Sequence, residues 1–239
     1  MDHAMKGLFF KEWKMMKGFF ISQFVVMALL LIFPSFSIFS LRVDQLLELM
    51  VLGVIVIPAA FLFSLNTEVN QMQSFLHNPH SIHKLLSVKG MYSLFCAVSV
   101  LFVFIILITG YEFISPAFSM PIWKVWLYML SMGIKLLVIS IFVAVILLFL
   151  WTLHQIWRTY IGGGLSIVLV VALMIAGNWL FSFFVESKAF EVLTHWGKVF
   201  STSGFMIGPG YLGVYVFYGV LTIFVYVVSA YLIDHKVEA

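Results

Sequence analysis

Residues 159–185 read TYIGGGLSIVLVVALMIAGNWLFSFFV, and none of them is Asp, Glu, Lys or Arg. The same lack of charge extends over five other long blocks, which are 18–41, 49–67, 90–111, 136–157 and 199–233. A helix needs roughly 20 apolar residues to cross a hydrocarbon core about 30 Å thick. Each block is about that long or longer. The pattern therefore predicts an all-α polytopic membrane protein with six transmembrane helices.

The composition agrees with this class. Hydrophobic residues make up 63% of the chain and charged residues 10%, which is far too little charge for an ordinary water-exposed surface. The segments between the apolar blocks are short, so we expect a single membrane domain over residues 1–239. The single cysteine, Cys96, excludes an intramolecular disulfide framework. The net charge of +3 gives no reason to expect a nucleic-acid partner, because the basic residues are expected at the membrane surface.

The expected helices are about 19–40, 47–65, 91–111, 125–151, 162–185 and 211–233. We expect a tight polar turn at 152–161. The segment 186–210 is too long for one crossing and too broken by glycine and proline for two. It predicts a re-entrant segment before the last helix, buried against protein.

Lys and Arg predict the orientation. An even number of spans places both termini on one side, together with eight of the 13 basic residues: Lys6, Lys11, Lys14, Lys17, Lys84, Lys89, Arg158 and Lys236. The other side holds four: Arg42, Lys124, Lys188 and Lys198. This imbalance places both termini in the cytoplasm.

The amino terminus has two faces. Apolar residues recur at steps of three and four, namely Met5, Phe9, Trp13, Met16 and Phe20. Charged residues fall elsewhere around the helix and include Lys11, Glu12, Lys14 and Lys17. The pattern predicts an amphipathic interfacial helix, with its apolar side in the membrane lipid and its lysines at anionic headgroups. Such a helix serves either as a simple anchor or as an elbow that also touches a cytoplasmic partner.

The largest cytoplasmic segment runs from Glu68 to Lys89. Its apolar spacing predicts two short amphipathic helices broken at Asn78-Pro79, with Ser81 as the cap of the second. Its order of residue types is a glutamate, an apolar pair, a proline, a small polar residue, a second apolar pair and a lysine. These are Glu68, Phe75, Leu76, Pro79, Ser81, Leu85, Leu86 and Lys89.

This order resembles the loop of ABC-2 type transporter permeases. The start of the chain, Leu8-Phe9-Phe10-Lys11-Glu12-Trp13, resembles the leading Lys-Glu element of the same family. His80 and His83 stand where the family usually has a basic residue after the proline. The resemblance implies a permease subunit of an ATP-driven exporter in a bacterial plasma membrane, paired with a second permease subunit. It makes the loop the element that couples to a separate ATPase subunit.

The chain itself is not expected to be an enzyme or to hold a cofactor. It contains no Gly-x-x-x-x-Gly-Lys-Ser/Thr, and the glycines of 162–166 lack the lysine that a phosphate loop needs. ATP and Mg²⁺ are therefore expected on the partner subunit. The many phenylalanines suit a hydrophobic or amphipathic cargo, such as an antimicrobial peptide, a drug or a lipid. The alternatives are a stand-alone secondary transporter or channel and a membrane enzyme or scaffold.

Two polar features allow more than one interpretation. His77, His80 and His83 recur at steps of three, which is a metal-site pattern, but Pro79 interrupts it, so solvated loop histidines are the simpler interpretation. Lys135 lies inside a predicted span. It predicts either an intramembrane ion pair or substrate contact, or a side chain that extends outward to the interface. Glu48 and Glu112 are its candidate partners.

Overall fold

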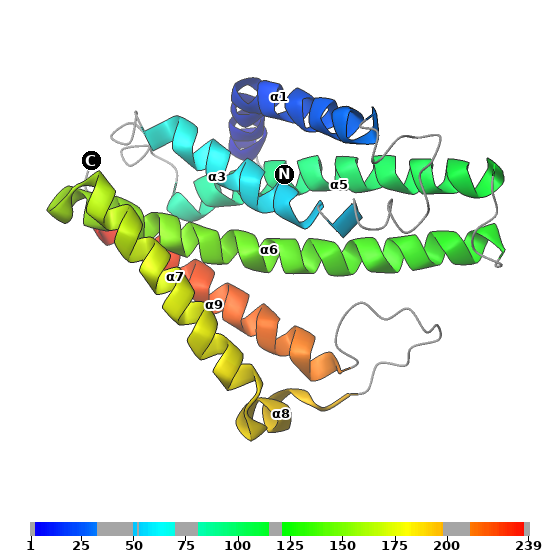
Figure 1. Ribbon diagram of the computed structural model, residues 1–239. Helices are drawn as coiled ribbons and strands as arrows, with labels where there is room; N and C mark the ends of the chain where they lie inside the picture. Colours follow the sequence, from blue (N-terminus) through cyan, green and yellow to red (C-terminus); the bar gives the residue numbers. More distant parts are fainter. Residues whose placement is uncertain are drawn as a thin grey trace. The chain divides into compact units, whose positions relative to one another are not determined.

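A computed structural model describes residues 3–32, 50–51, 53–69, 81–114, 121–197 and 211–236 (Figure 1). Every element of these ranges is a helix: α1 His3–Ile32, the 3-10 helix η2 Gly53–Ile55, α3 Val56–Val69, α5 Ile82–Ile114, α6 Ile122–Ile161, α7 Gly163–Val185, α8 Lys188–Thr194 and α9 Leu212–Lys236. The predicted all-α class is confirmed for this part of the chain.

Four of the helices are long and apolar enough to cross a membrane: α5, α6, α7 and α9. Helix α3 with its 3-10 start forms a shorter apolar helix, Gly53–Glu68. These helices fit a multi-pass membrane protein. Residues 33–49 and 70–80 lie outside the described part. They include the end of the first predicted span, its connection to the second span, and the centre of the predicted coupling loop.

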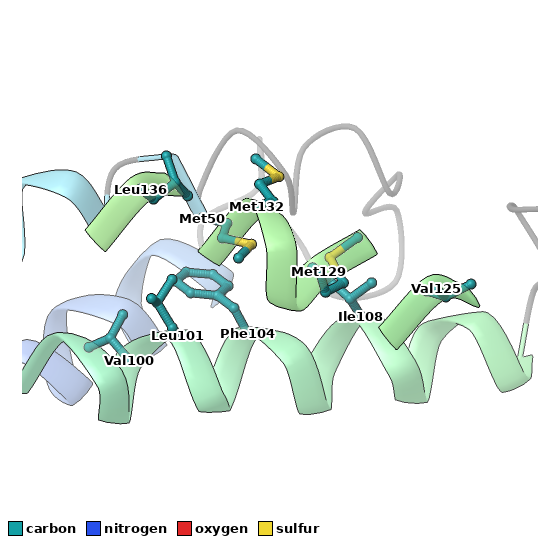
Figure 2. Close-up of a cluster of buried hydrophobic side chains, with 9 residues drawn as sticks. All are labelled: Met50, Val100, Leu101, Phe104, Ile108, Val125, Met129, Met132 and Leu136. Atoms are coloured by element: carbon teal, nitrogen blue, oxygen red, sulfur yellow. The ribbon is translucent and has the colours of Figure 1, made fainter. Parts of the chain in front are cut away.

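The chain forms two compact units, Met1–Ile141 and Phe142–Ala239. The first contains a core in which one face of α5 meets one face of α6 (Figure 2). The α5 side chains are Val100, Leu101, Phe104 and Ile108, and the α6 side chains are Val125, Met129, Met132 and Leu136, with Met50 against them. Steps of three and four place each set on one stripe of its helix. Close packing holds such a core, because lipid is as apolar as the side chains.

The start of α3 is shaped by Pro58, which lies in its first turn. Proline has no N–H, so the carbonyl four residues earlier, that of Val54, loses its helical donor. The hydroxyl of Ser140 on α6 donates to this carbonyl at 2.6 Å. A buried carbonyl without a donor is costly, so Ser140 compensates for the proline and ties α6 to the beginning of α3.

The amino-terminal segment and the first predicted span, as far as Ile32, form one helix, α1. Figure 1 shows it bent, with its darkest-blue first part and its remainder running in different directions. Its apolar stripe does not face lipid, contrary to the prediction from the sequence. Met16 is fully buried with Tyr92 and Cys96 of α5, and Phe9, Trp13 and Phe20 pack against this group. Aromatic partners on α5 explain the difference: Trp13 meets Tyr92 and Phe95 edge to face, at centroid distances of 6.2 and 5.8 Å.

Two predicted helix boundaries are wrong. Helix α5 begins at Ile82, so the second short helix of the predicted loop is the start of the span itself. Helix α6 continues through the predicted turn at 152–161 and ends only at Ile161. Residues 152–161 are polar but contain no glycine or proline, and polarity alone does not stop a helix. The break comes at Gly162, whose φ of 84° favours glycine.

The second unit contains α7, α8 and α9. Ser187 caps α8 by accepting the Phe190 N–H at 3.3 Å. Two backbone bonds join the chain just after α8 to the start of α9: Leu212 N–H donates to the Gly197 carbonyl at 2.8 Å, and Gly213 N–H to that of Trp196 at 3.2 Å. A Cβ on Gly213 would lie 2.3 Å from the Thr194 carbonyl oxygen, so only glycine fits there. Most of the predicted re-entrant segment, 198–210, lies outside the described residues.

Candidate functional site

Five polar side chains from three helices meet in the first unit, and we call them the charge cluster. They are Lys11 and Glu12 of α1, Ser64 and Glu68 of α3, and Lys89 of α5. Lys89 is the centre. Its Nζ lies 3.2 and 3.3 Å from the two carboxylate oxygens of Glu12, 3.0 Å from Oε2 of Glu68 and 2.8 Å from the Ser64 hydroxyl.

Two further contacts complete the cluster. Lys11 Nζ donates to Oε1 of Glu68 at 2.9 Å, so that Glu68 lies between two ammonium groups. The Ser64 hydroxyl donates to Glu12 and accepts from Lys89. The two lysines and two glutamates sum to zero charge. Each charge therefore has an opposite charge beside it, which is the condition under which buried ions are tolerated.

Burial raises the energetic cost of leaving any charge of this cluster without its partner. The side chain of Lys89 is 2% exposed, that of Glu12 5% and that of Glu68 11%, whereas that of Lys11 is 55% exposed. Removal of one partner from a buried ion pair leaves the other charge uncompensated, at a cost of about 3–5 kcal/mol. Helices α1, α3 and α5 are therefore held in one arrangement by Lys89.

The cluster lies where the 70–80 segment leaves and re-enters the bundle. Glu68 is in the last turn of α3, which ends at Val69, and Lys89 is in the third turn of α5, which begins at Ile82. The ion pair between them therefore joins the two ends of the predicted coupling loop. Glu12 joins the same point to α1. A displacement of the loop ends must move α1 or break buried ion pairs.

The packing around the cluster is aromatic. The Tyr92 hydroxyl, one turn after Lys89, donates to the Met16 carbonyl at 2.8 Å, one turn after Glu12. The ring of Tyr92 lies 6.3 Å from that of Phe9 and 6.2 Å from that of Trp13. These contacts continue the α1–α5 interface away from the charges and fix how α1 is rotated about its axis.

Sequence reasoning singled out four of the five cluster residues but not their contacts with one another. Glu68 and Lys89 were expected at the loop ends, and Lys11 and Glu12 in the interfacial helix. Ser64 was missed; its only signal is its position one turn before Glu68 on the same helix face. Of the other interfacial residues, Trp13 packs on α5, and Lys14 and Lys17 are exposed.

The remaining predicted loop residues divide into three groups. Phe75, Leu76 and Pro79 lie outside the described residues. Ser81 directly precedes α5 and is exposed, and its carbonyl accepts the Lys84 and Leu85 N–H groups at 2.9 and 3.2 Å. Leu85 and Leu86 are 7% and 1% exposed. These two leucines pack inside this chain, whereas the exposed residues at the start of α5 are Ser81, His83, Lys84 and Ser87.

The two ambiguous polar features are seen only in part. Lys135 lies in α6 and is partly buried, while the side chains of its candidate partners Glu48 and Glu112 lie outside the described residues. Of the three spaced histidines, only His83 lies in the described part, on α5. Within that part no three His, Cys, Asp or Glu side chains gather as metal ligands.

No family model, no curated protein and no solved structure matches this chain.

Proposed function

We propose that the chain is the membrane subunit of an ATP-driven exporter, related to the ABC-2 type permeases that its loop and amino terminus resemble. In this proposal six helices cross the plasma membrane and both termini are cytoplasmic. The chain pairs with a second permease subunit, and each docks on an ATPase subunit that holds ATP and Mg²⁺. The cargo is hydrophobic or amphipathic.

One observation carries the proposal: the charge cluster ties both ends of the cytoplasmic loop to α1. A loop that receives force from an ATPase must transmit it to membrane helices, and a flexible connector does not. Here Glu68 and Lys89 close the loop at its base, and Glu12 passes any movement to α1 through a contact of 3.2 Å. The ions move together because separating them in a buried site is costly.

The Glu12→Gln variant separates coupling from docking. It weakens the link to α1 but leaves the Glu68–Lys89 pair and the loop surface unchanged. We expect the variant to retain the ATPase on purification and to lose most ATP-dependent transport. Lys124→Met, which changes an exposed lysine of α6, is the matched control and should transport normally.

The assay is ATP-dependent movement of rhodamine 6G and of a fluorescent amphipathic peptide into inside-out vesicles, with a candidate ATPase subunit co-expressed. Movement driven by an ion gradient without ATP would contradict the proposal and favour a secondary transporter. Normal ATP-dependent transport by Glu12→Gln would contradict the coupling role.

Docking is tested at the loop itself. Replacement of Leu76 and Pro79 by Gly should release the ATPase, because the sequence predicts an apolar anchor at Leu76 and a bend at Pro79. Leu85 is excluded from this variant, because it is buried in the chain and its loss would disturb α5. Co-purification of the ATPase at wild-type yield would rule out docking at these two positions.

A further inference from the structure

The exposed side of the first half of α1 carries positive charge that no acidic side chain of this helix balances. Lys6, Lys14 and Lys17 are exposed, and with Phe10 they recur at steps of three and four along one side of the helix. None of these three ammonium groups takes part in an ion pair within the described part of the chain. Glu12, the one acidic residue of α1, is buried in the charge cluster.

The same side of the helix becomes apolar just beyond its last lysine. Ile21 and Val25 continue from Lys17 at steps of four, and they are 60% and 52% exposed. Residues 18–41 contain no charge, and the sequence predicts that they enter the bilayer. Ile21 is about 6 Å beyond Lys17 along the helix axis. Lipid whose acyl chains cover Ile21 and Val25 therefore has its phosphate groups beside Lys17 and Lys14.

This side of α1 is not the side that the sequence predicts for lipid, because Phe9 and Trp13 pack against buried residues of α1 and α5. Phe10 is instead 58% exposed among the lysines, and the Lys14 ammonium lies 4.9 Å from the centre of its ring. An aromatic ring among lysines is typical of the level of lipid headgroups. Gly18 lies one turn beyond Lys14, and the space beside its Cα is open, so a headgroup is able to approach the helix there.

We propose that this side of α1 binds the headgroups of anionic phospholipids and selects them over zwitterionic ones. We call it the lysine face, and its residues are Lys6, Phe10, Lys14 and Lys17. The ammonium groups donate to phosphate oxygens in charge-assisted hydrogen bonds, and their surplus of positive charge favours a lipid with net negative charge. A soluble acidic protein fits less well, because exposed apolar side chains begin at Ile21, just beyond the last lysine. Such lipid binding requires only that the charge-free part of α1 lies in a bilayer, and it depends neither on ATP nor on the proposed transport function.

The test uses the full chain in phosphatidylcholine nanodiscs that contain phosphatidylglycerol, without an ATPase. Two photoactivatable probes are compared, a phosphatidylglycerol and a phosphatidylcholine with the same diazirine near the top of one acyl chain. Labelled chymotryptic peptides of α1 are quantified by mass spectrometry. Lys14→Gln with Lys17→Gln removes two charges from the lysine face, and Lys14→Arg with Lys17→Arg keeps them. Lys124→Gln with Lys188→Gln, at exposed positions of α6 and α8, is the matched control for net charge.

The ratio of phosphatidylglycerol to phosphatidylcholine labelling of α1 is the quantity measured. It should fall about tenfold or more in the double Gln variant, because each lysine at an anionic surface contributes a factor of about five. It should stay near the wild-type value in the double Arg variant and in the control. Salt at about 1 M should also lower the wild-type ratio, because charges are then screened beyond about 3 Å. Equal labelling by the two lipids in the wild type, or an unchanged ratio in the double Gln variant, would overturn the inference.

Two further measurements separate a lipid surface from a protein surface and from a folding defect. A candidate ATPase subunit should co-purify with the double Gln variant at wild-type yield. Loss of that subunit together with an unchanged labelling ratio would assign the lysine face to a protein partner and overturn the inference. Phosphatidylglycerol should raise the unfolding temperature of the wild type and of the double Arg variant more than that of the double Gln variant. An equal rise in all three proteins would contradict binding at these lysines.

Discussion

At the scale of single residues, Lys89 is the centre of the charge cluster. Its ammonium group neutralises two buried carboxylates on two other helices. Lys89→Met keeps the length of the side chain and removes the charge. We expect a loss of about 3–5 kcal/mol of unfolding free energy, because Glu12 would then lose its contact with a cluster cation and Glu68 would keep Lys11 alone. Unfolding followed by circular dichroism in detergent measures this loss.

A double variant tests the reason for that loss. Lys89→Met with Glu12→Gln removes one positive and one negative charge together, and Glu68 keeps its 2.9 Å contact with Lys11. It should recover a substantial part of the lost stability. Lys14→Met, at an exposed position of α1, should change stability by less than about 0.5 kcal/mol. Equal effects of Lys89→Met and Lys14→Met would contradict the burial argument.

At the scale of helices, the Ser140 hydroxyl of α6 takes the place, at the start of α3, of the N–H that Pro58 lacks. Ser140→Ala should cost about 1 kcal/mol, because the Val54 carbonyl then loses its donor. In a Pro58→Ala background the new N–H of residue 58 is able to donate to the same carbonyl, so Ser140→Ala should cost clearly less. A double-mutant cycle by chemical unfolding measures the difference. Additive effects of the two changes would show that the hydroxyl does not replace the missing N–H.

Three consecutive glycines, 162–164, lie at the junction between α6 and α7, and the turn there depends on the first of them. Gly162 has a φ of 84°, so Gly162→Ala should destabilise the junction by about 1 kcal/mol. Gly164 lies inside α7 with open space around its Cα, so Gly164→Ala should be neutral or stabilising by up to about 1 kcal/mol. Thermal unfolding of the two matched variants decides between them, and a reversed order would contradict the assigned turn.

At the scale of the whole molecule, the prediction concerns topology. In a Cys96→Ala background, a cysteine at Ser201 should react with an impermeant thiol reagent in intact cells. A cysteine at Ser81 should react only after lysis, because the excess of lysine and arginine predicts a cytoplasmic position for this end of α5. Equal labelling of the two positions in intact cells would refute the six-span arrangement with cytoplasmic termini.

Sequence reasoning found the membrane class because a water-soluble domain needs charge on its surface and rarely contains long blocks without it. It also placed α7 and α9 within a few residues, since glycine, proline or charge bounds both. It misplaced the end of α6, by predicting a turn at 152–161, and the start of α5, which is at Ile82. A charge-free block marks only the hydrocarbon crossing, and a helix can continue beyond it. The contacts within the charge cluster could not be predicted, because they depend on how α1 is rotated against α5. That rotation is set by the packing of Trp13 on Tyr92, which exists only in the folded chain.

The charge cluster also has a consequence for the order in which the helices fold during synthesis. A nascent chain that has inserted only α1 and α3 carries the carboxylates of Glu12 and Glu68 with Lys11 as the one cluster cation, since Lys89 belongs to α5. We therefore expect α1, α3 and α5 to form a stable unit only after α5 has left the ribosome. A chain truncated before α5 should be recognised by membrane proteases and degraded, and co-expression of the remaining segment, with its lysine, should protect it.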